Sequence, residues 1–197
     1  MTSRAKEDER FWSDRFTKWK DIRAVTFANK TVAANHATYV AAAVQLRKYT
    51  TTDLPGKRSS VLEIGYGLGH YTRVCKDVGF ETYVGIDFAA PPGPDLGPQY
   101  RYLRHDIGLR LDLGRKFELV TAIDVLFHIT DEARFEAALD NLQKHASKFI
   151  YVTGLMRDKR FKNAPQVVCR DLSRFKRLGR LVRLKPWRDN SIACFAI

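Results

Sequence analysis

The sequence has few cysteines, no long apolar run and no apolar N-terminal segment. In its 197 residues, no run approaches the roughly 18 apolar residues that a membrane-spanning helix needs. Met1–Arg10 contains no apolar stretch, so it does not resemble a signal peptide, and we expect a cytoplasmic location. Cys75, Cys169 and Cys194 are odd in number and far apart, which argues against a disulfide framework and against a zinc site.

Positive charge is abundant but unevenly placed along the chain. The net charge is +12, yet residues 61–150 are acidic, with 10 Lys and Arg against 13 Asp and Glu. Residues 1–60 carry 12 basic against 6 acidic side chains, and residues 151–197 carry 12 against 3. Basic flanks of this kind attract an anionic substrate, nucleic acid or an anionic membrane surface. The alternative is that they are solvated helices and loops.

The length suits one domain over residues 1–197, in which residues 1–57 are predicted to form a helical lid or cap. Residues 1–20 place aromatic side chains at helical spacing, and residues 31–49 are rich in alanine, so both are predicted helices. Residues 50–60 contain Pro-Gly and are a predicted loop.

Strands and helices alternate in the predicted core, residues 58–197. This alternation favours a parallel sheet with helices on both faces, which is a three-layer, doubly wound α/β fold. The predicted strands are 61–64, 82–88, 100–105, 117–123 and 148–153, the predicted helices 69–78, 131–145 and 172–178, and a polar loop covers 157–162. Strands 180–187 and 191–197 are joined by a turn so short that they must be antiparallel neighbours, a hairpin at the sheet edge.

A glycine-rich segment follows the first predicted core strand and precedes a helix. Gly65, Gly67 and Gly69 allow backbone angles closed to other residues and let a ligand approach the main chain. Dinucleotide-binding loops place a third glycine at the sixth position, where this chain has His70. Glu63, just before the loop, would repel a pyrophosphate. A cationic ligand that carries a sulfonium and an ammonium group would instead favour acidic residues.

Three more carboxylates follow the ends of the next three predicted strands. Open α/β sheets bind ligands at the carboxyl ends of their strands, so we expect these side chains to share one site with the glycine loop. Asp87 is suited to accept ribose hydroxyls, and Asp106 with Ile107 to hold an adenine amino group and ring. Asp124 is expected beneath the loop that faces the reacting methyl group. Singly, each is more often a helix cap or a surface charge.

This arrangement resembles the class I S-adenosylmethionine-dependent methyltransferases. The motifs that carry the resemblance are 61–70, 83–87, 104–107 and 117–129. The resemblance covers about residues 58–153 and implies a Rossmann-like, mostly parallel seven-stranded sheet with closing antiparallel strands. It also implies S-adenosylmethionine as methyl donor and S-adenosylhomocysteine as product. Tyr66 stands where the family often has Cys, Ala or Ser, and it adds an aromatic wall.

The predicted cofactor contacts combine the glycine loop with the acidic residues. They are Glu63, Gly65, Tyr66, Gly67, Gly69, Asp87, Phe88, Asp106, Ile107 and Asp124, with Arg15 at the cofactor carboxylate. No metal is predicted, because Thr153–Met156 supplies none of the carboxylates that a magnesium site would need after the fifth strand.

The acceptor is less sharply indicated. The segment Asp124–Ile129 and the N-terminal Phe11–Phe16 resemble small bacterial-type methyltransferases that act on sugars, glycan precursors or natural products, mostly at oxygen. That similarity would place Trp12 and Trp19 in a lid, although Trp19 also suits core packing. His128 is the candidate general base, and the alternative is that it orients its loop or packs against the cofactor.

The charge pattern keeps a second acceptor class open. We expect an anionic small-molecule or glycan acceptor, and RNA is the alternative, bound through the many Lys and Arg residues after 156. Against RNA, the sequence has no added RNA-binding domain, and its basic residues lack regular interleaving with aromatics.

Overall fold

The computed structural model describes residues 3–26, 29–154, 157–161, 164–188 and 190–197. Its centre is a seven-stranded sheet in the order β3-β2-β1-β4-β5-β9-β8. Neighbours from β3 to β5 are parallel, while β9 is antiparallel to both β5 and β8. The strand bounds are β1 Arg58–Ile64, β2 Phe80–Asp87, β3 Tyr100–Arg104, β4 Phe117–Ala122, β5 Ala146–Gly154, β8 Arg180–Trp187 and β9 Asn190–Ala196.

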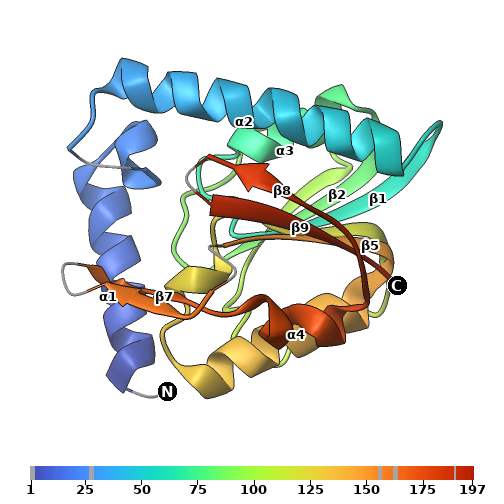
Figure 1. Ribbon diagram of the computed structural model, residues 1–197. Helices are drawn as coiled ribbons and strands as arrows, with labels where there is room; N and C mark the ends of the chain where they lie inside the picture. The colour runs from blue at the N-terminus through green and yellow to red at the C-terminus, as the bar shows by residue number, and fades with distance from the viewer. Residues whose placement is uncertain (1–2, 27–28, 155–156, 162–163, 189) are drawn as a thin grey trace.

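Helices cover both faces of the sheet (Figure 1). The helices α2 (Val32–Asp53) and α3 (His70–Asp77) lie on one face, and α4 (Glu132–His145) with the 3-10 helix η3 (Leu172–Leu178) lies on the other. Successive side chains of a strand point to opposite faces, so Val61 of β1 packs in the α2–α3 cluster and Leu62 in the α4 cluster. The predicted three-layer α/β sheet with a closing hairpin is confirmed.

The N-terminal helix α1 (Ser3–Lys18) is not part of either layer. It crosses one end of the sheet, and the short 3-10 helix η1 (Ile22–Ala24) links it to α2 (Figure 1). A second 3-10 helix, η2 (Leu126–His128), follows β4. None of the described helices is long and apolar enough to cross a membrane.

Two local predictions are wrong. The helix α2 continues to Asp53, past the predicted loop start at residue 50, because Thr50 is buried and Leu54 packs in the same cluster. The predicted polar loop over 157–162 contains the strand β6 (Lys159–Phe161), which pairs antiparallel with β7 (Ala164–Cys169) in a separate two-stranded sheet. This pairing depends on β7, a strand that the hydrophobic periodicity of the sequence did not indicate. Residues 1–2, 162 and 189 of the predicted elements lie outside the described residues.

One buried amide fixes the loop that follows β3. Asn141 of α4 donates through Nδ2 to the carbonyls of Ile107 (2.8 Å) and Leu109 (2.6 Å). Its Oδ1 accepts from the backbone N–H of Leu111 at 3.1 Å. A buried backbone group without a partner is unfavourable, so this side chain holds Ile107 in place.

We expect Asn141→Ala to lower the free energy of unfolding by about 2–4 kcal/mol, because it leaves three backbone groups unpaired. Urea denaturation followed by circular dichroism measures the change. Gln143→Ala, at an exposed position of the same helix, is the control and should stay within about 0.5 kcal/mol of the wild type. Equal losses in both variants would contradict this role for Asn141.

Candidate active site

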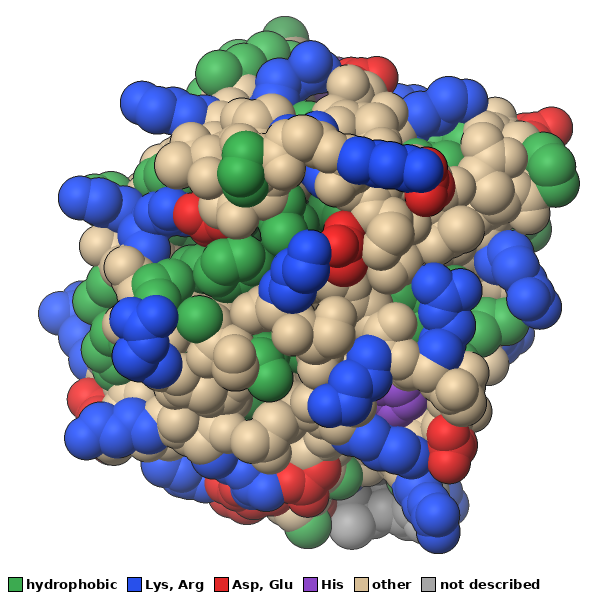
Figure 2. Space-filling view, turned by 90° about the vertical axis from the view of Figure 1, so that its right-hand side faces the viewer, with side chains coloured by type: hydrophobic (Ala, Val, Ile, Leu, Met, Phe, Trp, Pro, Cys, Tyr) green, Lys and Arg blue, Asp and Glu red, His purple; other side chains and the backbone are tan. Residues whose placement is uncertain are grey.

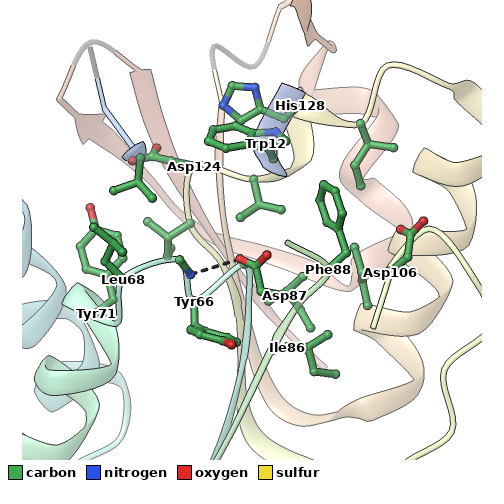
Figure 3. A pocket seen from close by; sticks show the side chains of 18 of the residues that line it. Trp12, Tyr66, Leu68, Tyr71, Ile86, Asp87, Phe88, Asp106, Asp124 and His128 are labelled. Atoms are coloured by element: carbon green, nitrogen blue, oxygen red, sulfur yellow. Dashed lines mark hydrogen bonds between the residues drawn. The ribbon is translucent and has the colours of Figure 1, made fainter. Parts of the chain in front are cut away.

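A cavity opens at the carboxyl ends of β1, β2 and β4, and Trp12 of α1 lies over it (Figure 3). It encloses about 920 Å³, counting its open mouth. Most of its lining is apolar or aromatic, and the charged groups on it are few. They are Asp8, Asp87, Asp106, Asp124 and Arg134, with the histidines His70, His105 and His128. A mostly apolar cavity with a few convergent polar groups is typical of a small-molecule site.

The glycine loop forms the floor of the cavity. Gly65, Gly67 and Gly69 have φ of 73°, 54° and 73°, in the left-handed region that favours glycine. A Cβ on Gly65 would lie 2.2 Å from Cγ2 of Val125, so the two loops approach closer than any side chain would allow. Gly65 and Gly67 line the cavity, whereas Gly69 caps α3 outside the lining.

Asp87 ties the glycine loop to the end of β2. Its Oδ2 accepts from the N–H of Gly67 at 3.1 Å, and its Oδ1 accepts from Ala89 and Ala90 at 2.9 Å each (Figure 3). Burial raises the pKa of Asp87, and these backbone bonds oppose that rise. The side chain lines the cavity beside Phe88, where sequence analysis placed a ribose contact.

The pair expected at the adenine is also on the lining, with a partner that sequence analysis missed. Asp106 accepts from the N–H of Gly108 at 2.9 Å through Oδ1, and its Oδ2 forms an ion pair with Arg134 at 2.5 Å. Ile107 is buried at the cavity wall. Arg134 lies 28 residues further along the chain, on α4, so no local pattern indicated it.

Tyr66 belongs to the aromatic part of the lining. Its hydroxyl donates to the Pro91 carbonyl at 3.0 Å. Its ring centroid lies 5.0 Å from that of Tyr102. The residue that departs from the family pattern therefore forms an aromatic wall that is fixed at both its ring and its hydroxyl.

Glu63 does not line the cavity, which corrects its predicted role as a cofactor contact. Only 2% of it is exposed, and it accepts from Thr72 (2.9 Å) and Tyr83 (2.6 Å). Strand alternation turns this β1 side chain toward α3, below the loop rather than into it. Burial raises the pKa of Glu63 to about 7, and its bonds to Thr72 and Tyr83 join α3 to β2.

Asp124 lies on the lining with a left-handed backbone (φ 58°). Its Oδ1 accepts from the Thr153 hydroxyl at 2.9 Å, and its Oδ2 pairs with Arg188 at 2.6 Å. The Arg188 guanidinium also lies 5.0 Å from the ring centroid of Tyr39, which lines the same end of the cavity with Tyr71. Asp124 is therefore an ion-paired group rather than a free carboxylate.

His128 stands at the top of the cavity beside Trp12 of α1 (Figure 3). Its Nδ1 lies 3.1 Å from the Gln166 carbonyl, and its ring centroid lies 4.8 Å from that of Trp12. Because a carbonyl only accepts, this contact assigns the proton to Nδ1 and leaves a lone pair on Nε2. Burial lowers the pKa of His128 to about 4, so the ring is neutral near pH 7.

Arg15 has a different role from the predicted one at the cofactor carboxylate. It does not line the cavity, and its guanidinium donates to the carbonyls of Ala24 (2.8 Å), Arg23 and Thr26 (2.5 Å). These bonds anchor α1 to the segment around η1. The turn after α1 brings these backbone carbonyls close to the guanidinium, where they take the place of the predicted cofactor carboxylate. The spacing of residues in the sequence does not indicate this contact.

Asp8, which was not among the predicted site residues, also lies on the lining. One signal was available. Asp8, Trp12 and Phe16 recur every four residues along α1, which places them on one face of the helix. All three line the cavity. Among the described residues no cluster of His, Cys, Asp or Glu has the arrangement of a metal site.

Residues 11–188 match the family described as "Methyltransferase domain", which covers most of the chain. The chain therefore belongs to the class I S-adenosylmethionine-dependent methyltransferases. It is an enzyme whose cofactor is S-adenosylmethionine, and the predicted family and cofactor are confirmed. None of the curated proteins matches the sequence. The glycine cradle that a Cβ would fill and the half-buried Asp87 fit this cofactor.

Solved structures share the fold at low identity. Magnesium protoporphyrin IX methyltransferase from Synechocystis PCC 6803, with bound S-adenosylmethionine, has a TM-score of 0.70 and 15% identity over 100% of this chain and 97% of that one. The N-methyltransferase NodS from Bradyrhizobium japonicum WM9 has a TM-score of 0.61 and 16% identity, covering 81% and 96%. The glycopeptide N-methyltransferase MtfA reaches 0.58 and 14%, covering 79% and 93%.

We expect Gly65→Ala to weaken S-adenosylhomocysteine binding by at least about tenfold, because the new Cβ collides with Val125 and displaces the loop. Isothermal titration calorimetry measures the affinity. Gly79→Ala is the matched control, because Gly79 also has a positive φ (84°) but has no atom within 4 Å of an added Cβ. Both variants carry backbone strain, and only the first should lose affinity.

The raised pKa of Glu63 predicts a pH-dependent contribution to stability. Between pH 4.5 and about 7 the folded protein holds a proton that the unfolded chain has released, so this contribution is present below pH 4.5 and is lost as pH rises to about 7. Glu63→Gln removes the titration. The unfolding free energy of the wild type minus that of the variant should fall across this window, by the order of 3 kcal/mol. A pH-independent difference would contradict the assignment.

Proposed function

We propose that this methyltransferase transfers the methyl group to an oxygen of a small-molecule, sugar or glycan acceptor, with His128 as general base. The observation that carries the proposal is the contact of His128 Nδ1 with the Gln166 carbonyl, which leaves Nε2 able to take a proton. When bound, S-adenosylmethionine supplies an electrophilic methyl carbon. The residues of the chain then hold the acceptor hydroxyl in line and receive its proton at Nε2 of His128.

The cofactor is proposed to lie along the floor of the cavity. Asp87 would accept the ribose hydroxyls, and Asp106 with Ile107 would hold the adenine. The backbone of Gly65 and Gly67 would face the methionine end. An acidic lining suits a cofactor that carries a sulfonium and an ammonium group, because an anion placed beside Asp87 would be repelled.

The acceptor is proposed to lie under α1, where the lining is aromatic and apolar. Trp12, Phe16 and Val25 present apolar faces on which a sugar ring or an aromatic ring can pack. Trp12 contacts His128 directly, so an acceptor seated on the indole would meet the proposed base. We infer that α1 contributes to acceptor recognition, in keeping with the predicted lid.

An anionic group of the acceptor would have to stay outside the cavity. Among the described residues on the lining, Arg134 is the only basic side chain of the Lys or Arg type, and it already pairs with Asp8 and Asp106. A buried anion without a partner is strongly unfavourable. Exposed Lys18 and Lys20, near the end of α1, are available to such a group instead.

The RNA alternative receives less support from the arrangement of charge. Five of the arginines after residue 156 form ion pairs with acidic side chains of this chain: Arg170 with Glu132, Arg174 with Glu132 and Glu136, Arg177 with Glu136 and Asp140, Arg183 with Asp53, and Arg188 with Asp124. On the face shown in Figure 2, Lys and Arg side chains are scattered with Asp and Glu among them, rather than forming one continuous basic track. Phosphate tracking needs unpaired cations in a row.

Nitrogen is the alternative acceptor atom, since two of the similar structures are of N-methyltransferases. Oxygen and nitrogen acceptors are distinguished by incubating the protein with a small-molecule extract of its source and S-adenosylmethionine labelled with ¹³C in the methyl group. An O-methyl resonance in the product supports the proposal, and an N-methyl resonance would overturn its choice of atom. Methyl transfer to an RNA fraction alone would favour the alternative class.

With that acceptor in hand, we expect His128→Ala to lower kcat by about 10²–10⁴-fold while S-adenosylhomocysteine affinity stays within about twofold. The reason is that only proton transfer is lost. A loss of cofactor affinity of the same size as the loss of rate would instead support a structural role. Because the pKa of His128 is lowered to about 4, the wild-type rate should not fall near pH 6.5, as it would with an ordinary histidine base.

A further inference from the structure

The helix α1 is held over the cavity in an unusual way. Among its described side chains no apolar one is fully buried: Phe11, Trp12 and Phe16 are half-buried. The most buried side chain is a carboxylate, Asp8, which is 6% exposed. A helix seated by packing buries an apolar stripe instead. The position of α1 therefore depends on specific polar contacts.

Asp8 contacts the start of α4 and the residue two positions before it. It accepts from the N–H of Thr130 at 3.3 Å and from the Thr130 hydroxyl at 3.2 Å, and it pairs with Arg134 at 3.3 Å. Burial raises the pKa of Asp8, while these partners act against the rise. A buried carboxylate that lost them would be strongly destabilised, so the contacts fix where α1 can sit.

Arg134 carries the same connection to the far side of the cavity. Its other terminal nitrogen pairs with Asp106 at 2.5 Å, and all three side chains line the cavity. A Cβ on Gly108 would lie 2.8 Å from Cβ of Arg134, so Arg134 packs directly on the loop after β3. One guanidinium thus joins a carboxylate of the helix above the cavity to a carboxylate at its wall.

We propose that the Asp8–Arg134–Asp106 bridge couples the docking of α1 to cofactor binding. Asp8 and Arg134 are positioning residues: they hold Asp106 and the lid in one arrangement and need not touch the reacting atoms. The coupling rests on the proposed placement of adenine at Asp106. A cofactor that orders Asp106 and Arg134 also raises the equilibrium constant for docking of α1. By thermodynamic linkage, the docked helix raises the affinity for the cofactor by the same factor.

The first test is Asp8→Asn, which keeps the shape and removes the charge. Asp14→Asn is the matched control, because Asp14 lies on the same helix and, within the part of the chain that the structure describes, forms an ion pair with exposed Arg10 alone. In the wild type, S-adenosylhomocysteine should slow hydrogen–deuterium exchange of the amides of α1. Asp8→Asn should weaken S-adenosylhomocysteine binding by about tenfold and remove most of that protection, while the control behaves as the wild type.

A double-mutant cycle with Asp106→Asn tests the bridge itself. If the two carboxylates act through Arg134, the loss of affinity in the double variant should be smaller than the product of the two single losses. Losses that multiply would overturn the coupling. So would an Asp8→Asn protein that binds normally while α1 exchanges faster both with and without ligand, because Asp8 would then serve structure alone.

Two further controls keep the outcome interpretable. Should Asp8→Asn fail to fold by circular dichroism, Thr130→Val removes a hydrogen bond to the same carboxylate and should give the same two changes, smaller in size. A wild-type protein that binds no S-adenosylhomocysteine would contradict the cofactor site. Normal wild-type binding that Asp106→Asn leaves unchanged would contradict the adenine placement, and with it the coupling.

Discussion

The carboxylate of Asp87 joins two loops that the sheet alone would leave independent. It accepts from Gly67, in the loop after β1, and from Ala89 and Ala90, in the loop after β2. Parallel strands deliver these loops to one edge of the sheet, and the shared carboxylate sets their spacing. Gly67 in the floor of the cavity and the aromatic wall of Tyr66, whose hydroxyl donates to Pro91 in the loop after β2, belong to these two joined loops.

The balance of charge around this floor explains how the site can be both acidic and stable. Asp106 and Asp124 are each paired with an arginine, and Asp8 shares Arg134 with Asp106. Asp87 is satisfied by backbone N–H groups rather than by a cation, so it keeps its attraction for a positively charged ligand. Paired carboxylates shape the walls, and Asp87 is the acidic group at the centre.

Sequence patterns were most informative where the signal is local. The strand–glycine loop–helix order around Gly65, and the carboxylates Asp87, Asp106 and Asp124 just after successive strands, follow from periodicity and from the rule that strand ends meet at one edge. The parallel direction of the core strands and the antiparallel closing hairpin were also predictable, from the alternation of strands with helices and from the short turn. The strand β6 was not predictable. It pairs with β7 in a separate two-stranded sheet, and its sequence has no regular alternation of apolar and polar residues.

The sequence by itself indicated the class of the enzyme, its cofactor and the edge of the sheet where the cavity opens, because the glycine loop and the carboxylates Asp87, Asp106 and Asp124 follow strands whose ends meet at one edge. Only the tertiary structure decided which polar groups face that cavity. Glu63 turns away into the core, Arg15 is taken by backbone carbonyls, and Asp8 meets Arg134, 126 residues away. Such choices are made by partners distant in the chain, which compete for each buried charge once the layers have packed.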